Sequence, residues 1–204
     1  MTSSKTSSAE QPTPVSALSS TDRTKVPLPI APGTAEHLCL ALANSIVTLP
    51  GGRRIDELDS PESATAWLMS HDLAPKGTGL LAYCQLQLTD LRRHLRGALM
   101  THTQGLAPDP ESLEGINRAL TAVPSAALLR YKPDEGLRRV ASHPVTQLVA
   151  HAMAQIAEDA AALLTGSEAD RIARCASEPC DRFMVRTHAR RHWCSSRCGA
   201  RQRA

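Results

Sequence analysis

The chain has 204 residues and a formal net charge of +3, and 42% of its residues are hydrophobic but only 2% aromatic. A core of that composition must be built from Leu, Ala, Val and Ile, which favours a helical body. The sequence has no secretory signal and no apolar stretch long enough to span a bilayer. We therefore expect a cytoplasmic protein with reduced thiols and no membrane contact.

Residues 1–32 are rich in Ser, Thr and Pro, and we expect them to form a disordered N-terminal tail. The helical body is predicted over residues 33–168. Its first helix is expected over residues 34–49, where apolar residues recur at helical spacing until PGGRR ends the pattern. Within this helix, Asn44 is unusual on an otherwise apolar face, and we interpret it as a hydrogen-bonded core residue.

Four further helices and one hairpin follow. Ser60 and Pro61 predict a helix start, and a leucine stripe predicts the longest helix, over about residues 78–102. DPESLEGINRAL predicts the next helix, and HPVTQLVAHAMAQIAEDAAALLTG predicts one from Pro144 to Gly166. Between these two, SAALLRYKPDEGLRRVAS (residues 125–142) is typical of a β-hairpin. Arg92, Arg93 and Arg96 are expected on a solvated helix face.

The charge is divided unevenly along the chain. From Arg171 onward there are nine arginines and two acidic residues, whereas the first 170 residues carry 18 acidic and 14 basic side chains. An acidic body with a strongly basic C-terminal segment predicts that this segment meets a polyanion. A merely solvated basic tail would have the same charge, so that interpretation stays open.

Four of the six cysteines lie in this basic segment, in the pattern Cys175-x4-Cys180-x13-Cys194-x3-Cys198. Two close pairs separated by a spacer are what a tetrahedral zinc site needs. A segment of about 35 residues cannot hold itself together by burial alone, so a metal would supply the missing free energy. We predict one structural Zn²⁺ held by these four thiolates, with Phe183 and Trp193 packed beside it.

A mixed cysteine and histidine site is the alternative. His188 and His192 have the spacing of a ligand pair, but Cys180 precedes His188 by fewer residues than usual, and two thiols would be left over. Four-cysteine ligation is therefore favoured. The remaining cysteines, Cys39 and Cys84, are expected to be small apolar residues of the body.

The C-terminal segment resembles a CGNR zinc finger. The matching pieces are CASEPC, Phe183, RRHWCS at 190–195 and CGAR at 198–201, with Ala200 where the signature has Asn and His192 inserted before Trp193. In such proteins the finger follows a helical ABATE domain, to which LALANSIVT and AWL are similar in position. The predicted fold is thus mainly α: a bundle-like body with a small β-hairpin, then a zinc-stapled finger at residues 169–204.

The resemblance implies a bacterial transcription regulator whose finger binds DNA and whose helical domain binds a small-molecule ligand or mediates assembly, for example as a homodimer. Arginine is the expected contact residue, because its planar guanidinium can donate two hydrogen bonds at once to a phosphate group or to guanine. The candidate nucleic-acid contacts are Arg190, Arg191, Arg197, Arg201 and Arg203.

The arginines and the chain as a whole also have alternative interpretations. Part of the arginine cluster could instead neutralise the thiolates and donate hydrogen bonds to sulfur. A zinc-stapled protein-interaction module without DNA binding is the alternative function. An enzyme is not expected, because the sequence has no catalytic motif.

Overall fold

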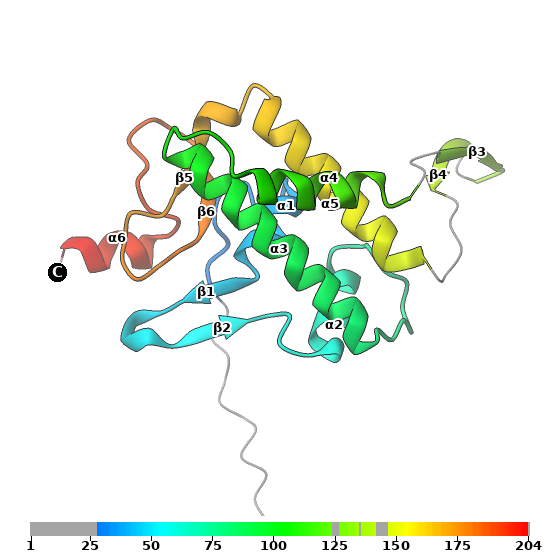
Figure 1. The fold of residues 1–204 in the computed structure, drawn as a ribbon, viewed down its shortest axis with the longest axis horizontal. Coiled ribbons are helices and arrows are strands. Elements are labelled where there is room, and N and C mark those ends of the chain that lie inside the picture. The colour runs from blue at the N-terminus through cyan, green and yellow to red at the C-terminus, as the bar shows by residue number, and fades with distance from the viewer. Residues whose placement is uncertain (1–27, 124–126, 135, 142–146, 204) are drawn as a thin grey trace, which may run out of the picture.

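The structure is a computed structural model that describes residues 28–123, 127–134, 136–141 and 147–203. Helices predominate in this part of the chain, beside small antiparallel hairpins (Figure 1). The mainly α fold expected from the sequence is confirmed. In chain order, the elements are α1 (Leu38–Asn44), β1 (Ile46–Thr48), η1 (Pro50–Gly52), β2 (Arg54–Asp56), α2 (Pro61–Ser70), α3 (Ala82–Thr103), α4 (Pro110–Thr121), β3 (Ala127–Lys132), β4 (Gly136–Ala141), α5 (Leu148–Thr165), η3 (Ala169–Arg171), β5 (Ile172–Arg174), β6 (Phe183–Val185) and α6 (Ser196–Arg203).

The helix starts follow the capping residues in the sequence. Ser60 caps α2: its hydroxyl accepts a hydrogen bond from the Ser63 N–H, and the Ser63 hydroxyl accepts one from the Ser60 N–H. The carboxylate of Asp109 caps α4 by accepting from the Ser112 N–H at 3.0 Å. Such caps satisfy backbone donors that have no partner inside the helix.

Helix α3 lies at the centre of the body. It packs against α1, α2, α4 and α5, and against strand β5. Its leucine stripe, formed by Leu88, Leu91, Leu95 and Leu99, is buried. Burying one such side chain stabilises the fold by about 1.5–3 kcal/mol, so this stripe organises the core.

The helix predicted over residues 34–49 is confirmed only over Leu38–Asn44, and it is wrong at both ends. Helix α1 ends at Asn44, and the next residues form strand β1, which pairs antiparallel with β2. The turn between them contains Gly51 and Gly52, with φ of +76° and +75°. Glycine reaches this left-handed region without steric cost, so PGG makes the turn between β1 and β2. It is not the helix stop expected from the sequence, because α1 already ends at Asn44.

The other predicted elements differ mainly at their ends. The β-hairpin predicted within 125–142 is confirmed as β3 and β4, and α3 begins at Ala82, four residues later than expected. The last predicted helix is described from Leu148, and its expected start at Pro144 lies outside the described residues. The expected tail reached residue 32, but residues 28–32 lie against the C-terminal finger, where the Pro32 carbonyl accepts from the Val185 N–H.

Arg92 is buried, so the prediction that it lies on a solvated helix face is wrong. Only 6% of the residue is exposed. Its guanidinium makes two hydrogen bonds to the Asp56 carboxylate, at 2.6 and 2.8 Å, and one to the Ser45 hydroxyl at 3.0 Å. Burial alone would raise the pKa of Asp56, but the hydrogen bonds from Arg92 and the Leu58 N–H hold it below its ordinary value.

The finger shares the core of the helical body. Ile172, Phe183 and Val185, from strands β5 and β6, belong to the same buried cluster as the leucines of α3, and Phe183 is fully buried. The core of the body therefore includes side chains from the C-terminal segment. Phe183 was expected beside the metal, but it packs among the helices instead.

Two polar side chains of the body fix this strand in place. The Asn44 side-chain amide donates to the Phe183 carbonyl and accepts from the Phe183 N–H, both at 2.8 Å, which confirms Asn44 as a hydrogen-bonded core residue. Arg96 donates to the Asp181 carboxylate at 2.9 Å and lies over the Phe183 ring at 5.4 Å. Arg96 is thus also an interface residue and not a solvated one, because its charge is paired with Asp181.

We predict that Asp56→Asn lowers the free energy of unfolding by about 2 kcal/mol at neutral pH, because Arg92 loses its charged partner in a buried place. The difference from wild type should shrink below about pH 4, since the contribution of Asp56 is present above its unfolded pKa and is lost as the pH falls through its lowered folded pKa. Urea unfolding of the variant and the wild type, at neutral pH and below about pH 4, measures the difference in the free energy of unfolding.

Glu114→Gln is the matched control. Glu114 pairs with Arg118 on the exposed face of α4, so its loss should change stability by less than about 0.5 kcal/mol. Equal effects of the two variants would contradict the buried role of Arg92.

Candidate metal centre

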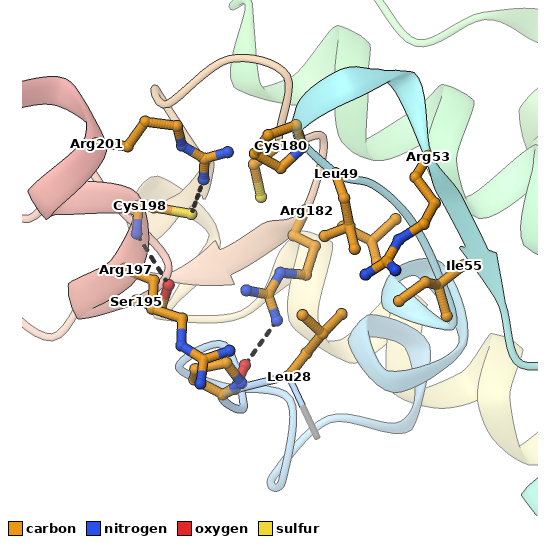
Figure 2. Close-up of a pocket in the computed structure, with 13 residues that line it drawn as sticks. Leu28, Leu49, Arg53, Ile55, Cys180, Arg182, Ser195, Arg197, Cys198 and Arg201 are labelled. Carbon is orange, nitrogen blue, oxygen red and sulfur yellow. Dashed lines mark hydrogen bonds between the residues drawn. The ribbon is translucent and has the colours of Figure 1, made fainter. Parts of the chain in front are cut away.

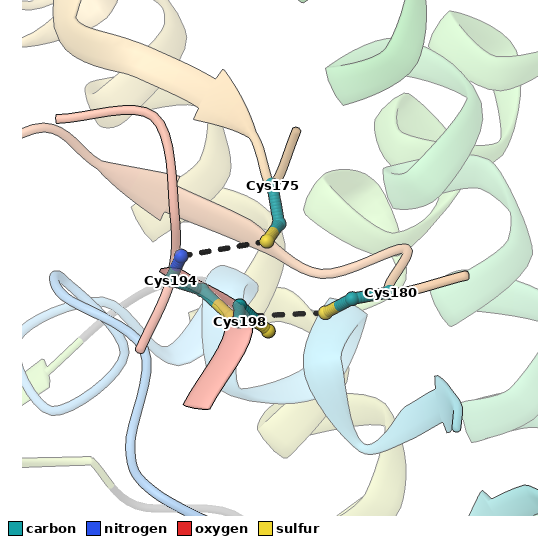
Figure 3. Close-up of side chains that lie close together, drawn as sticks. All are labelled: Cys175, Cys180, Cys194 and Cys198. Atoms are coloured by element: carbon teal, nitrogen blue, oxygen red, sulfur yellow. Dashed lines mark hydrogen bonds between the residues drawn. The ribbon is translucent and has the colours of Figure 1, made fainter. Parts of the chain in front are cut away.

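The four cysteines of the finger converge on one point (Figure 3). Their sulfur atoms all lie within 4.8 Å of one another, and all four residues are buried. The Cys180 and Cys194 sulfurs are 3.7 Å apart, and the Cys194 and Cys198 sulfurs are 3.6 Å apart. A tetrahedron with zinc–sulfur bonds of about 2.3 Å has edges of about 3.8 Å, so the cluster fits one Zn²⁺.

Local backbone structure brings each pair of cysteines together. Cys175 follows β5, and a turn closed by the Cys180 N–H and the Ser177 carbonyl, at 2.8 Å, returns the chain to β6. Cys198 lies in the first turn of α6, where the Ser195 hydroxyl accepts from the Cys198 N–H at 3.3 Å. The Cys194 N–H points at the Cys175 sulfur at 3.4 Å, a contact typical of thiolate ligands.

The alternative histidine ligands are not part of the cluster. His188 and His192 are both exposed, and the only groups of metal-ligating side chains found together in the described residues are the four cysteines. A closed set of four thiolates has no open position for water or substrate, so the ion that it fits is structural.

Trp193 packs beside the cysteines, as expected from the sequence. Its ring also explains the glycine of the CGAR stretch. A Cβ placed on Gly199 would lie 3.2 Å from Cε3 of Trp193, which is closer than side-chain atoms normally approach. A side chain at residue 199 would therefore require the indole ring to shift by a few tenths of an ångström, and glycine lets the α6 backbone lie against the ring without that shift.

Charge around the cluster is balanced by buried arginines. Burial would lower the pKa of Arg182, but the neighbouring Cys194 and Cys180 thiols raise it. Arg182 is 6% exposed and donates to the Pro29 carbonyl at 2.6 Å. Arg201 donates to the Cys198 sulfur at 3.2 Å. Part of the arginine cluster thus contacts the cysteine site. This is the alternative role considered for the arginines, in which they neutralise the thiolates and donate hydrogen bonds to sulfur.

The five predicted nucleic-acid contacts divide into two groups. Arg190, Arg197 and Arg203 are exposed. Arg191 and Arg201 are half-buried and bonded within the finger: Arg191 donates to the Trp193 carbonyl at 3.1 Å, and Arg201 donates to sulfur. The first group is therefore the one that solvent and an external anion can reach.

Sequence reasoning missed Arg182 and Asp181 as site residues. Asp181 accepts from Arg96 and from the Thr48 N–H, and Arg182 reaches the Pro29 carbonyl. Both residues directly follow Cys180, and the signal that could have found them is that position: a side chain next to a metal ligand has a fixed direction and is well placed for a long-range contact.

The other cysteines behave as expected. Cys39 is 1% exposed on α1, and burial raises the pKa of its thiol. Cys84 is half-buried at the edge of the same core. Neither belongs to the metal cluster, and both are small apolar residues of the body.

A helical domain joined to a C-terminal four-cysteine zinc finger is the class of protein that this fold and site define. A family model described as "Putative stress-induced transcription regulator" (ABATE) matches residues 36–167, and the model of the CGNR zinc finger matches residues 171–204. The chain belongs to the ABATE family and ends in a CGNR zinc finger, which confirms the resemblance. No curated protein matches the chain.

Neither family description names a catalytic activity. Among the described residues, no helix is both long and apolar enough to cross a membrane.

We predict that the purified protein contains about one zinc per chain and that Cys198→Ser lowers its melting temperature by roughly 10–20 °C. Because Phe183 and the α3 leucines share one core, loss of the metal should destabilise the helices as well as the finger. Thermal unfolding followed by far-ultraviolet circular dichroism, together with metal analysis, checks both statements.

Cys84→Ser is the control for this experiment, since Cys84 lies in the body and outside the cluster. It should keep its zinc and shift the melting temperature by no more than a few degrees. A helical transition that is the same in wild type and Cys198→Ser would show that the body does not depend on the finger.

Proposed function

We propose that this chain is a zinc-dependent DNA-binding transcription regulator. In this proposal Cys175, Cys180, Cys194 and Cys198 hold one structural Zn²⁺. Residues 169–204 form the DNA-contacting finger, and residues 33–168 form a body that senses a ligand or mediates assembly. The family description supports a regulator, and the exposed arginines beside the cysteine cluster are the observation that carries the DNA contact.

The charge of the finger supports a nucleic-acid contact after the metal is counted. Four thiolates with Zn²⁺ carry a charge of −2, and Arg182 and Arg201 lie against these sulfurs. Several arginines remain that make no contact with the cluster, and Arg190, Arg197 and Arg203 present their charge to solvent. An exposed guanidinium without an acidic neighbour is well suited to a phosphate oxygen.

Helix α6 carries two of these side chains, those of Arg197 and Arg203. It begins two residues after Cys194 and carries Cys198, so a bound metal would anchor its first turn. Arg203 lies over the Trp193 ring at 5.8 Å, which restrains the end of the helix. Arg197, in the same helix, is exposed. Arg191 and Arg201 would act in this proposal mainly by holding the finger and by adding positive potential.

A homodimer and a cytoplasmic location complete the proposal. One small finger buries little surface on a duplex, and specific DNA binding by small modules usually needs a second copy or a second contact. Two copies would double the number of exposed arginines on the DNA. Sedimentation of the zinc-loaded protein, with and without duplex DNA, measures the number of chains in the complex.

We predict that the zinc-loaded protein binds generic duplex DNA with an affinity that falls steeply as salt rises, because phosphate contacts release counterions. Arg197→Gln should weaken binding severalfold and reduce the slope of log affinity against log salt by about one. Fluorescence anisotropy at several salt concentrations measures both quantities.

Arg118→Gln is the matched control, since it removes the same charge from an exposed position on α4. It should leave the salt slope unchanged. If the loaded protein does not bind DNA even at low salt, the DNA contact is wrong and the chain is instead a zinc-stapled protein-interaction module.

A further inference from the structure

A cavity of about 680 Å³ lies between the β1–β2 hairpin and the finger (Figure 2). Neither the sequence pattern nor the family description assigns it a role. The hairpin forms one wall, and residues around Cys180 and the start of α6 form the other. Its volume is within the range of about 300–1,000 Å³ that is usual for sites that hold small molecules.

The wall from the hairpin side is mainly apolar. Val47, Leu49 and Ile55 line it, and Leu28 closes it from the N-terminal side. Leu49 and Ile55 are only partly buried, although both are large aliphatic side chains. Covering them with an apolar ligand would remove more of their surface from water, which favours binding by about 25 cal/mol per Å².

Apart from Cys180 and Cys198, which are thiolates when they hold the metal, all charged side chains that line the cavity are arginines: Arg53, Arg182, Arg197 and Arg201. No aspartate or glutamate is among the lining residues. The cavity therefore combines an apolar wall with a positive potential, and low-dielectric walls strengthen that potential.

The four arginines are not equivalent. Arg182 and Arg201 are engaged by the Pro29 carbonyl and the Cys198 sulfur, and they offset the charge of the thiolates. Arg53 and Arg197 are exposed, and neither guanidinium has an ion-pair or hydrogen-bond partner among the residues that the structure describes. They come from opposite walls, Arg53 from the end of the hairpin turn and Arg197 from α6 (Figure 2).

We propose that this cavity is a binding site for a small organic anion with an apolar body. The body would lie against Leu49 and Ile55, and the anionic group would accept hydrogen bonds from Arg53 and Arg197. A neutral apolar molecule would leave these guanidiniums unused, and a small inorganic anion would leave the apolar wall exposed. The combination of the two walls selects a ligand that has both parts.

Such a ligand would join the body to the finger. Arg53 belongs to the hairpin and Arg197 to α6, so one anion would contact both units. Arg197 is also one of the proposed DNA contacts, and the ligand would compete with phosphate for it. That competition rests on the proposed function, whereas binding in the cavity does not.

The test uses two fluorescent probes with nearly the same aromatic body. One is the sulfonate 8-anilinonaphthalene-1-sulfonate, and the other is neutral N-phenyl-1-naphthylamine. We expect the sulfonate to saturate one site on the full-length, zinc-loaded chain and to bind roughly tenfold more tightly than the neutral probe. Titration in the absence of DNA keeps the result independent of the proposed function.

Two variants locate the site. Replacing both Arg53 and Arg197 by Gln should weaken sulfonate binding roughly tenfold and change binding of the neutral probe by less than about twofold. Leu49→Trp should fill the cavity and weaken both probes. Arg118→Gln, on a remote exposed surface, is the charge control and should bind both probes like wild type.

Zinc content and helical circular dichroism show whether each variant is folded. If Leu49→Trp is not folded, the double variant of Arg53 and Arg197 decides alone whether the site is in this cavity. Sulfonate binding that does not saturate, or that is the same in the double arginine variant, would mean that the probe binds nonspecifically. Either result would overturn the proposal. If the sulfonate and the neutral probe bind equally well, the site does not recognise an anion, and the proposal is equally wrong.

Discussion

The insertion of Phe183 into the helical body is the contact on which the finger depends. About 35 residues with one Phe and one Trp cannot bury enough surface to fold alone. The chain resolves this in two ways at once: the cysteines fit a metal on one side of strand β6, and the helices receive its apolar side chain on the other. The finger is therefore built on a core that belongs to the body.

The four residues from Cys180 to Phe183 concentrate these constraints. Cys180 is in the metal cluster, Asp181 bonds Arg96 and Thr48, Arg182 bonds the Pro29 carbonyl, and Phe183 is held by Asn44. Successive side chains of an extended segment point in alternate directions, so one short stretch reaches several surroundings. A change at any one partner is transmitted to the metal ligand through a backbone that has little freedom to adjust.

The sequence predicted what depends on local pattern. Cysteine spacing indicated the metal cluster, and apolar periodicity with the helix starts at Ser60 and in DPESLEGINRAL indicated the helices. It did not predict contacts between distant segments. A lone Phe in a cysteine-rich segment is as suitable for packing beside a metal as for insertion elsewhere, and Arg92 looks solvated until Asp56 is brought to it. Ile46 to Thr48 continue an apolar run, and only pairing with β2 decides that they form a strand.

The β1–β2 hairpin is the element that links these distant contacts. Asp56 on β2 binds Arg92 of the central helix, Thr48 on β1 binds Asp181 of the finger, and Val47 and Ile55 line the cavity between them. Because paired strands move together, the position of the finger is coupled to the core of the body through hydrogen bonds on both strands. Side chains at that wall therefore lie between the body and the arginines of α6.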